Sequence, residues 1–368
     1  MTVRRRLAEF LLVGGGTLVL FPLAWLARRA LGPDPAEDAV DFLAYHAALV
    51  INNPHFAVTY LLFYKGAWRR ASSRELPATL RARYVFAGLV VPLVLVAWAG
   101  HALHAGSARS MGLLIQLMFF LVGWHYVKQG FGILTVLSAR RGYRFAPRER
   151  AVILAHCFAG WAYAWASPAD PGKVVHEKGV IYTSIAHPPG LELAAGIVFG
   201  LSTIALIGVI SHRWYSDRRP PPLAPLAGFL ITIWIWTVYS SVDRLMMYVI
   251  PALHSVQYLF MVWLLKRNEA RAEEGPPLFG RPVGVRLAML VAGAIGLGWL
   301  LFRGAPELLD DVPLLHPTSG EGAGHLGETP YFAAFFVLVN IHHYFMDHVI
   351  WRRENPDTRY LREPVGTG

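Results

Sequence analysis

Histidine is the residue type in this sequence with the most evident capacity for chemistry. Ten of the fifteen histidines lie within or at the ends of long apolar stretches: His46, His55, His101, His104, His125, His156, His254, His342, His343 and His348. An ionisable side chain is costly in such a stretch, and by default it marks a functional path or site. Neutral imidazole binds iron, copper and zinc, and facing helices can bring several imidazoles onto one ion.

Four of these histidines fall at similar depth in four different stretches, namely His55, His125, His254 and His343. Counted from the outer end of each stretch, they lie about 15–25 Å deep at 1.5 Å per residue. One intramembrane histidine is more often a structural hydrogen-bonding group than a ligand. Four at matched depth favour a metal or cofactor site.

Each of the four histidines has a polar neighbour three or four residues away, on the same face of a helix. These neighbours are Asn52, Gln129, Gln257 and Asp347, in chain order. They are candidates to orient the imidazoles or to add further ligands. Lys128 and Tyr258 are also close in sequence, and together with Asp347 they are the candidate catalytic residues.

The segment 340–348 is the densest in such groups, with Asn340, three histidines and Asp347. His342 and His343 point about 100° apart on a helix, so we expect one of the two to ligate rather than both. Asn340 is a further candidate contact to a cofactor.

His46 is a lower-ranked candidate ligand. It precedes His55 by nine residues, which places the two on opposite sides of a continuous helix. Both can reach one site only if the helix is interrupted, and the Asn52-Asn53-Pro54 run could interrupt it, because proline removes a backbone hydrogen bond.

The composition identifies the surroundings of these residues as a membrane. Hydrophobic residues make up 55% of the 368 residues and charged residues only 16%, against about 25% in soluble domains. This excludes a soluble enzyme, a disordered tail and a nucleic-acid-binding module. The single cysteine, Cys157, excludes an intramolecular disulfide and a CxxC site.

Ten stretches are long enough to cross a bilayer as helices. They are residues 7–27, 39–64, 82–104, 111–138, 150–167, 191–211, 223–241, 244–265, 286–302 and 330–351. We therefore expect an all-α, polytopic helix bundle of about ten transmembrane helices, with residues 1–368 as a single transmembrane domain. Residues 240–243 are the weakest boundary, because they form either a tight hairpin or a kink.

The basic residues predict how this bundle is oriented. With ten spans, 26 Lys and Arg lie on the side of both termini and 7 on the other. Because basic residues resist translocation, we expect both termini to be cytoplasmic and the protein to lie in a cell inner membrane. The excess of arginine, 29 against 5 lysines, is typical of a GC-rich bacterial genome.

The histidine motifs resemble those of the Brp/Blh family of membrane β-carotene dioxygenases. The similar motifs, in order, are Pro54-His55-Phe56, Trp124-His125-Tyr126, Leu253-His254-Ser255, and His342 followed by Asp347 and Arg352. The resemblance covers about 40 residues, and it implies a non-haem iron held by histidines and a polyene substrate.

The chain departs from the family pattern at three positions. Thr59 replaces an acid after the first histidine, Gln129 lies near the place of a missing acid, and Tyr258 replaces a second histidine of the third motif. Iron ligation then requires His342 or His343 to supply the imidazole ligand that Tyr258 cannot supply.

The leading interpretation is a membrane oxygenase or oxidoreductase with non-haem iron, acting on a lipid or polyene. Membrane lipids, a hydrophobic small-molecule substrate and a redox partner are the expected partners, and no nucleic acid is expected. A two-iron hydroxylase or desaturase is disfavoured, because the sequence lacks HxxxH and HxxHH boxes.

Two alternatives stay open. One is an electron carrier binding haem b between facing histidines, with Gly123, Gly130 and Gly132 making room near His125; another transition metal is also compatible with imidazole ligands. The other is a proton-coupled transporter with a relay of histidines, Lys128, Asp243 and Asp347.

Overall fold

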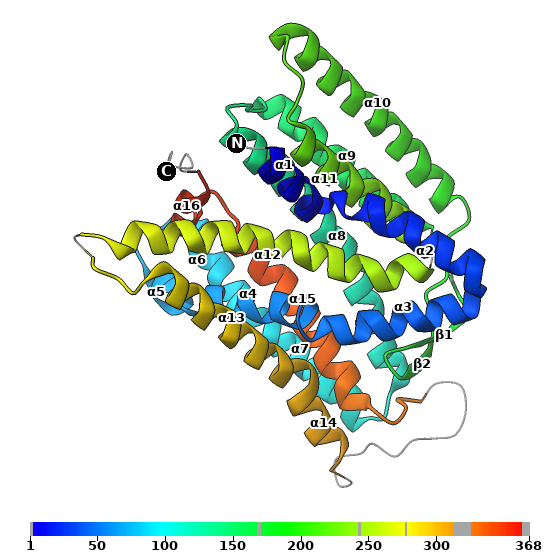
Figure 1. The fold of residues 1–368 in the computed structure, drawn as a ribbon. Helices are drawn as coiled ribbons and strands as arrows, with labels where there is room; N and C mark the ends of the chain where they lie inside the picture. The colour runs from blue at the N-terminus through cyan, green and yellow to red at the C-terminus, as the bar shows by residue number, and fades with distance from the viewer. Residues whose placement is uncertain (1–2, 168–170, 242–243, 277, 313–324, 363–368) are drawn as a thin grey trace.

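The computed structural model describes residues 3–167, 171–241, 244–276, 278–312 and 325–362. In these residues the expected all-α architecture is confirmed, with one small antiparallel strand pair beside the helices (Figure 1). Each of the ten predicted stretches is largely helical. Residues 240–243 are expected to form a hairpin or a kink. Residues 242 and 243 lie outside the described ranges.

The elements follow one another in three groups. The first group is α1 (Val3–Phe10), η1 (Leu11–Gly15), α2 (Thr17–Leu31), α3 (Pro33–Ala48), α4 (Asn52–Tyr64), α5 (Ala67–Ser72), α6 (Ala78–Val85), η2 (Phe86–Val90) and α7 (Val91–His104). The second is α8 (Ala108–Arg140), α9 (Pro147–Ala166), β1 (Val174–Glu177), β2 (Val180–Thr183), α10 (Leu191–Asp217), α11 (Leu223–Leu230), η3 (Ile231–Val238) and η4 (Tyr239–Ser241). The third is α12 (Arg244–Glu274), α13 (Val283–Trp299), η5 (Leu300–Gly304), α14 (Ala305–Asp310), α15 (Pro330–Ile350), η7 (Pro356–Thr358) and α16 (Arg359–Arg362).

Several of these helices have the length and composition of membrane spans. Among the described residues, five helices are long and apolar enough to cross a bilayer: Ala78–His104, Ala108–Arg140, Leu191–Asp217, Val249–Glu274 and Val283–Asp310. A sixth is counted if Val3–Gly15 and Thr17–Leu31, which meet at a bend of 58°, form one span. The length and composition of these helices indicate a multi-pass membrane protein.

Two breaks in the helices shape the interior. Gly14 has φ +133°, a conformation that L side chains rarely adopt, and the chain bends there. The second break separates α3 from α4 at residues 49–51, directly before the Asn52-Asn53-Pro54 run. The predicted continuous stretch 39–64 is thus two helices.

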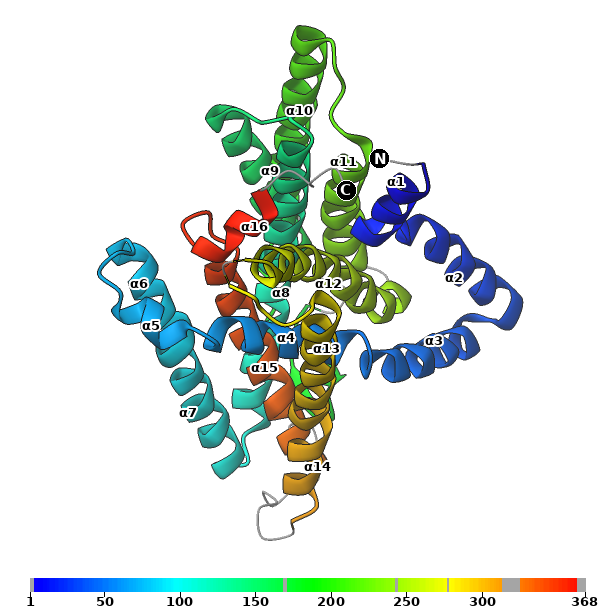
Figure 2. The ribbon, with the colours of Figure 1, turned by 60° about the vertical axis from the view of Figure 1, so that its left-hand side comes forward.

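The helices that carry the four matched histidines pack against one another. α15 contacts both α4 and α8, and α12 contacts α4. Figure 2 looks nearly along α12 and shows α4, α8, α13 and α15 gathered around it. The candidate residues therefore project from elements at the centre of the molecule.

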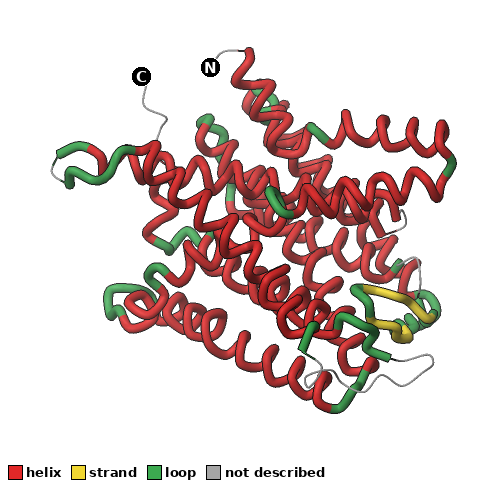
Figure 3. The backbone as a smooth tube through the Cα atoms, turned by 60° about the horizontal axis from the view of Figure 1, so that its bottom comes forward, coloured by secondary structure: helices red, strands yellow, loops and turns green. Residues whose placement is uncertain are grey.

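The strand pair lies at one edge of the helical body, away from α1 and α16 (Figures 1 and 3). Its two strands are joined at Lys178 and Gly179, which both have positive φ (54° and 84°), as tight hairpin turns require. The first and last helices of the chain therefore lie at the same side of the structure.

Candidate metal centre

Four imidazoles meet where α4, α8, α12 and α15 come together. His55, His125, His254 and His343 each come from a different one of these helices, and none is more than 4% exposed. Ring centroids are 4.5 Å apart for His55 and His343, and 4.9 Å apart for His125 and His254. Residues between 129 and 288 positions apart in sequence are thus in direct contact.

The ring nitrogens have the spacing of ligands to one ion. Nε2 of His125 lies 3.0 Å from Nε2 of His254 and 3.3 Å from Nε2 of His343. Two nitrogens each about 2.1 Å from a metal lie about 3.0–3.4 Å apart at angles between a right angle and the tetrahedral angle. One nitrogen of His55 is within 4.8 Å of the ligand atoms of His125 and His254.

The hydrogen bonding of His55 leaves one nitrogen free to ligate. Its Nδ1 lies 2.8 Å from the Ser255 hydroxyl, whereas its Nε2 is buried with no hydrogen-bond partner in the described part of the chain. Nδ1 of His254 and Nδ1 of His343 are buried and unpartnered in the same sense. Buried polar atoms are nearly always satisfied, so the unpartnered Nε2 of His55 indicates that the protein residues alone do not complete the site.

Asp347 adds a carboxylate to the cluster. One of its oxygens, Oδ2, lies 3.7 Å from Nε2 of His343 and 3.9 Å from Nε2 of His125. The other, Oδ1, accepts a hydrogen bond of 2.6 Å from the Tyr258 hydroxyl, which is itself 2.6 Å from the Thr59 hydroxyl. One carboxylate oxygen therefore faces the imidazoles while the other is held by hydroxyl groups.

Aromatic rings enclose the imidazoles. Centroid distances are 4.3 Å for Tyr126 on His254, 4.8 Å for Tyr344 on His125 and 4.9 Å for Phe56 on His343. Apolar surroundings of this kind limit solvent access and lower the local dielectric constant, which governs the chemistry of a metal site.

The two glutamines predicted to support the site, Gln129 and Gln257, form hydrogen bonds beside His254. Nε2 of Gln129 donates to the His254 carbonyl (3.3 Å) and to Oε1 of Gln257 (2.7 Å). Nε2 of Gln257 in turn donates to the Val13 carbonyl at 2.5 Å. These amides join α8, α12 and η1, and so hold the backbone around His254.

The predicted asparagines differ in their surroundings. Asn340 accepts a hydrogen bond of 3.1 Å from Tyr344, the tyrosine whose ring stacks on His125. Oδ1 of Asn52 is buried and has no hydrogen-bond partner among the described residues. Asn340 therefore contacts the cluster through Tyr344.

Of the adjacent histidines, His343 joins the cluster and His342 points elsewhere. Nδ1 of His342 lies 3.0 Å from the Tyr60 hydroxyl, and its Nε2 lies 3.0 Å from the Ala87 carbonyl. These contacts belong to the packing of α15 against α4 and η2.

Two further candidates lie away from the cluster. His46 is exposed on α3, and its Nδ1 is 2.8 Å from the Phe42 carbonyl of the same helix. The chain is interrupted between His46 and His55, but this break does not bring His46 to the cluster. The Lys128 ammonium lies over the rings of Phe131 and Phe158, at 5.8 and 5.9 Å.

Two residues of the site have roles that the sequence did not indicate. Ser255 is the hydrogen-bond partner of His55, but it lies 200 residues away, so spacing carries no signal for the pair. Thr59 lies four residues after His55 on α4, and this spacing could have placed it beside the site.

The fold and this cluster define a helical, multi-pass membrane protein with buried His and Asp groups that could bind a metal ion. Comparisons with family models, curated proteins and solved structures give no match.

Proposed function

We propose that this chain is a membrane-embedded oxygenase with one non-haem iron, acting on a lipid or polyene from the bilayer. In this proposal it crosses a bacterial inner membrane as a bundle of about ten helices. The observation that carries the proposal is the contact of four buried imidazoles from four helices beside one carboxylate.

Direct ring contact favours a single ion over haem b. A porphyrin coordinated by two histidines must lie between their rings as a wide disc. Here the Nε2 atoms of His125 and His254 are 3.0 Å apart, which leaves no room for the disc. Of the glycines expected to admit it, Gly130 lies against Thr232 and Gly123 lies against Trp161.

The donor set supports iron among the metals that imidazole binds. Two groups of possible ligands, His55, His125, His254 and His125, His343, Asp347, share His125. Together they offer more donors than the four ligands that zinc usually takes in proteins. A larger coordination shell of nitrogen and carboxylate ligands suits iron. The resemblance at the histidine motifs to the Brp/Blh dioxygenases also supports iron.

The residues of the site divide into ligands and supports. His55, His125, His254 and His343 would hold the ion, with Asp347 in reach of the same position. Bound iron would supply the activation of O₂ toward an unsaturated or aliphatic carbon. Tyr258 and Thr59 hold the Asp347 carboxylate in place, and Ser255 holds the His55 ring.

The surroundings of the cluster support a hydrophobic substrate. Tyr126, Tyr344 and Phe56 cover the imidazoles, so water is kept from the reacting groups. A lipid or polyene would enter from the bilayer. A redox partner is required only if the reaction consumes electrons beyond those that the substrate provides.

A proton relay through Lys128 and Asp347 is less well supported. Lys128 is on the same helix as His125, but its ammonium lies over Phe131 and Phe158 instead of facing Asp347. Asp243, the third charged member of that relay, lies outside the described residues.

The proposal is tested by elemental analysis and an absorption spectrum of detergent-purified protein. We expect about one iron per chain and no Soret band. The double variant His55→Ala, His343→Ala should lose the iron, because two of the four imidazoles are removed. His46→Ala is the matched control and should retain it, since His46 is exposed and outside the cluster.

A wild-type protein without metal after gentle purification and iron reconstitution would overturn the proposal. Iron retained in the double variant would place the metal elsewhere. With one iron confirmed, oxygen consumption in the presence of polyenes and unsaturated lipids identifies the substrate class.

A further inference from the structure

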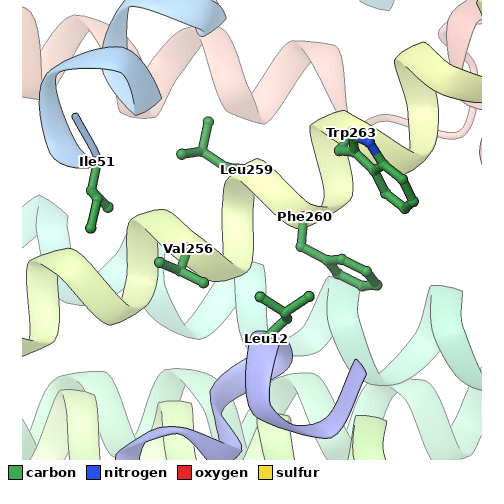
Figure 4. A pocket seen from close by; sticks show the side chains of 6 residues that line it. All are labelled: Leu12, Ile51, Val256, Leu259, Phe260 and Trp263. Atoms are coloured by element: carbon green, nitrogen blue, oxygen red, sulfur yellow. The ribbon is translucent and has the colours of Figure 1, made fainter. Parts of the chain in front are cut away.

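An apolar groove lies on the outer face of α12, apart from the histidine cluster. It has a volume of about 300 Å³ and is lined by Leu12, Ile51, Val256, Leu259, Phe260 and Trp263. Figure 4 shows these side chains around a space between α12, η1 and the start of α4. All six are apolar, so the groove fits a hydrocarbon chain.

The groove and the histidine cluster use opposite faces of α12. Val256, Phe260 and Trp263 follow one another at helical spacing along the groove. His254 and Tyr258 face the cluster and are 2% exposed each. Since α12 separates the two, the groove is not the path of the substrate to the metal.

A group of arginines lies at one end of the groove. Arg267 stacks on Trp263, with its guanidinium carbon 4.8 Å from the ring centroid. Arg271 and Arg5 lie close enough to repel it electrostatically. Within the described part of the chain, no carboxylate is within ion-pair distance of any of the three guanidinium groups.

We propose that the groove binds one acyl chain of an anionic phospholipid, with the phosphate at Arg267, Arg271 and Arg5. Val256 and Arg267 are eleven residues apart, about 16 Å along the helix, so one lipid can span the apolar lining and the arginines. Basic side chains at the end of a membrane helix attract anionic lipid head groups. The unpaired positive charge selects an anionic head group over a zwitterionic one.

The elements that line the groove are also joined to the interior. The Ile51 carbonyl accepts a hydrogen bond from the His55 backbone, and the Val13 carbonyl, next to Leu12, accepts one from Gln257. A lipid in the groove would therefore contact three segments that meet behind the cluster, and would stabilise their packing against one another.

Native mass spectrometry of the full chain in detergent tests the proposal. Dioleoyl phosphatidylglycerol and dioleoyl phosphatidylcholine are added at equal concentration, and the retained lipid is measured. We expect the wild type to retain phosphatidylglycerol preferentially. Arg267→Gln with Arg271→Gln should lower this preference roughly tenfold, because each basic group near the head group contributes several-fold.

A second pair of variants tests the groove itself. Leu12→Trp and, independently, Val256→Trp fill the space and should reduce retention of both lipids. Leu201→Trp, on the exposed face of α10, is the control for added bulk, and Arg69→Gln with Arg74→Gln is the control for lost charge. Thermal unfolding of each variant shows that it is folded.

Equal retention of the two lipids by the wild type would overturn the proposal. So would an unchanged preference after loss of Arg267 and Arg271, or unchanged retention in both groove-filling variants. None of these results bears on the metal, because the test requires no iron and no activity.

Discussion

At the scale of single residues, the orientation of His55 depends on one hydroxyl group. The Ser255 hydroxyl lies 2.8 Å from Nδ1 and leaves Nε2 without a hydrogen-bond partner in the described part of the chain. Hydrogen bonds to the second nitrogen of a ligating histidine fix its ring and raise its basicity. The hydroxyl is therefore a positioning group for the proposed ligand.

We expect Ser255→Ala to weaken iron binding about 10–100-fold, because the His55 ring loses its orienting partner. Competition with a chelator measures the affinity. Ser202→Ala is a matched control, since Ser202 lies 3.0 Å from Nδ1 of His156, a histidine outside the cluster. Equal affinity in the two variants would contradict the role of Ser255.

Tyr258 acts on the cluster through Asp347. Tyr258→Phe removes the 2.6 Å hydrogen bond to Oδ1 and leaves Thr59, at 3.5 Å, as the remaining hydroxyl near that oxygen. We expect the free energy of unfolding to fall by about 1–3 kcal/mol, because the buried carboxylate loses a short hydrogen bond. Iron affinity should also fall, because the carboxylate is no longer held.

Tyr60→Phe separates these two effects. It removes the hydroxyl of a half-buried tyrosine that contacts His342, which lies outside the cluster. Its stability should fall as well, but its iron affinity should stay near that of the wild type. Thermal unfolding and metal titration of the two variants side by side would show whether Tyr258 is only a structural residue.

At the scale of elements, the approach of α13 to α4 determines where His55 lies. A Cβ atom on Gly298 would be 2.7 Å from the carbonyl carbon and oxygen of Asn53, which is closer than real contacts allow. Glycine is therefore required where α13 crosses the first turn of α4. Two residues after Asn53 the same helix presents His55 to the cluster.

We expect Gly298→Ala to destabilise the protein by about 1–3 kcal/mol, the usual cost of overpacking, and to reduce its iron content by displacing α4. Gly296→Ala is the control on the same helix, because a Cβ atom there meets nothing within 4 Å. Alanine at Gly296 should leave the stability unchanged or raise it by up to about 1 kcal/mol. Identical unfolding curves for the two variants would show that the contact between α13 and α4 tolerates a methyl group at Gly298.

At the scale of the whole molecule, the distribution of basic residues predicts its orientation in the membrane. Lys and Arg resist translocation, and the loops expected on the side of both termini carry most of them. In the structure, α1 and α16 lie away from the strand pair, consistent with opposite ends of the bundle (Figure 1).

Cysteine labelling in spheroplasts tests this orientation. We expect Ala186→Cys, after β2, to react with a membrane-impermeant maleimide in intact spheroplasts. Ser72→Cys, at the end of α5, should react only after lysis. The wild-type chain is the control, because its single cysteine, Cys157, is buried. The reverse pattern of labelling would invert the proposed topology.

By itself, the sequence determined the helical class. Apolar runs longer than about 18 residues favour helices whatever their neighbours, because a helix satisfies its own backbone hydrogen bonds. Counting residues along such helices predicts His125, His254 and His343 at similar levels, because the rise per residue is constant. The same count does not apply to His55, because the stretch 39–64 is broken at residues 49–51.

Only the tertiary structure decided which side chains meet. The rotation of α15 directs His343 at the other imidazoles and His342 at Tyr60, although both lie at the same depth. The contact of Ser255 with His55 likewise depends on how α12 packs on α4. Helix rotation and crossing are set by packing between helices, which local sequence periodicity does not specify.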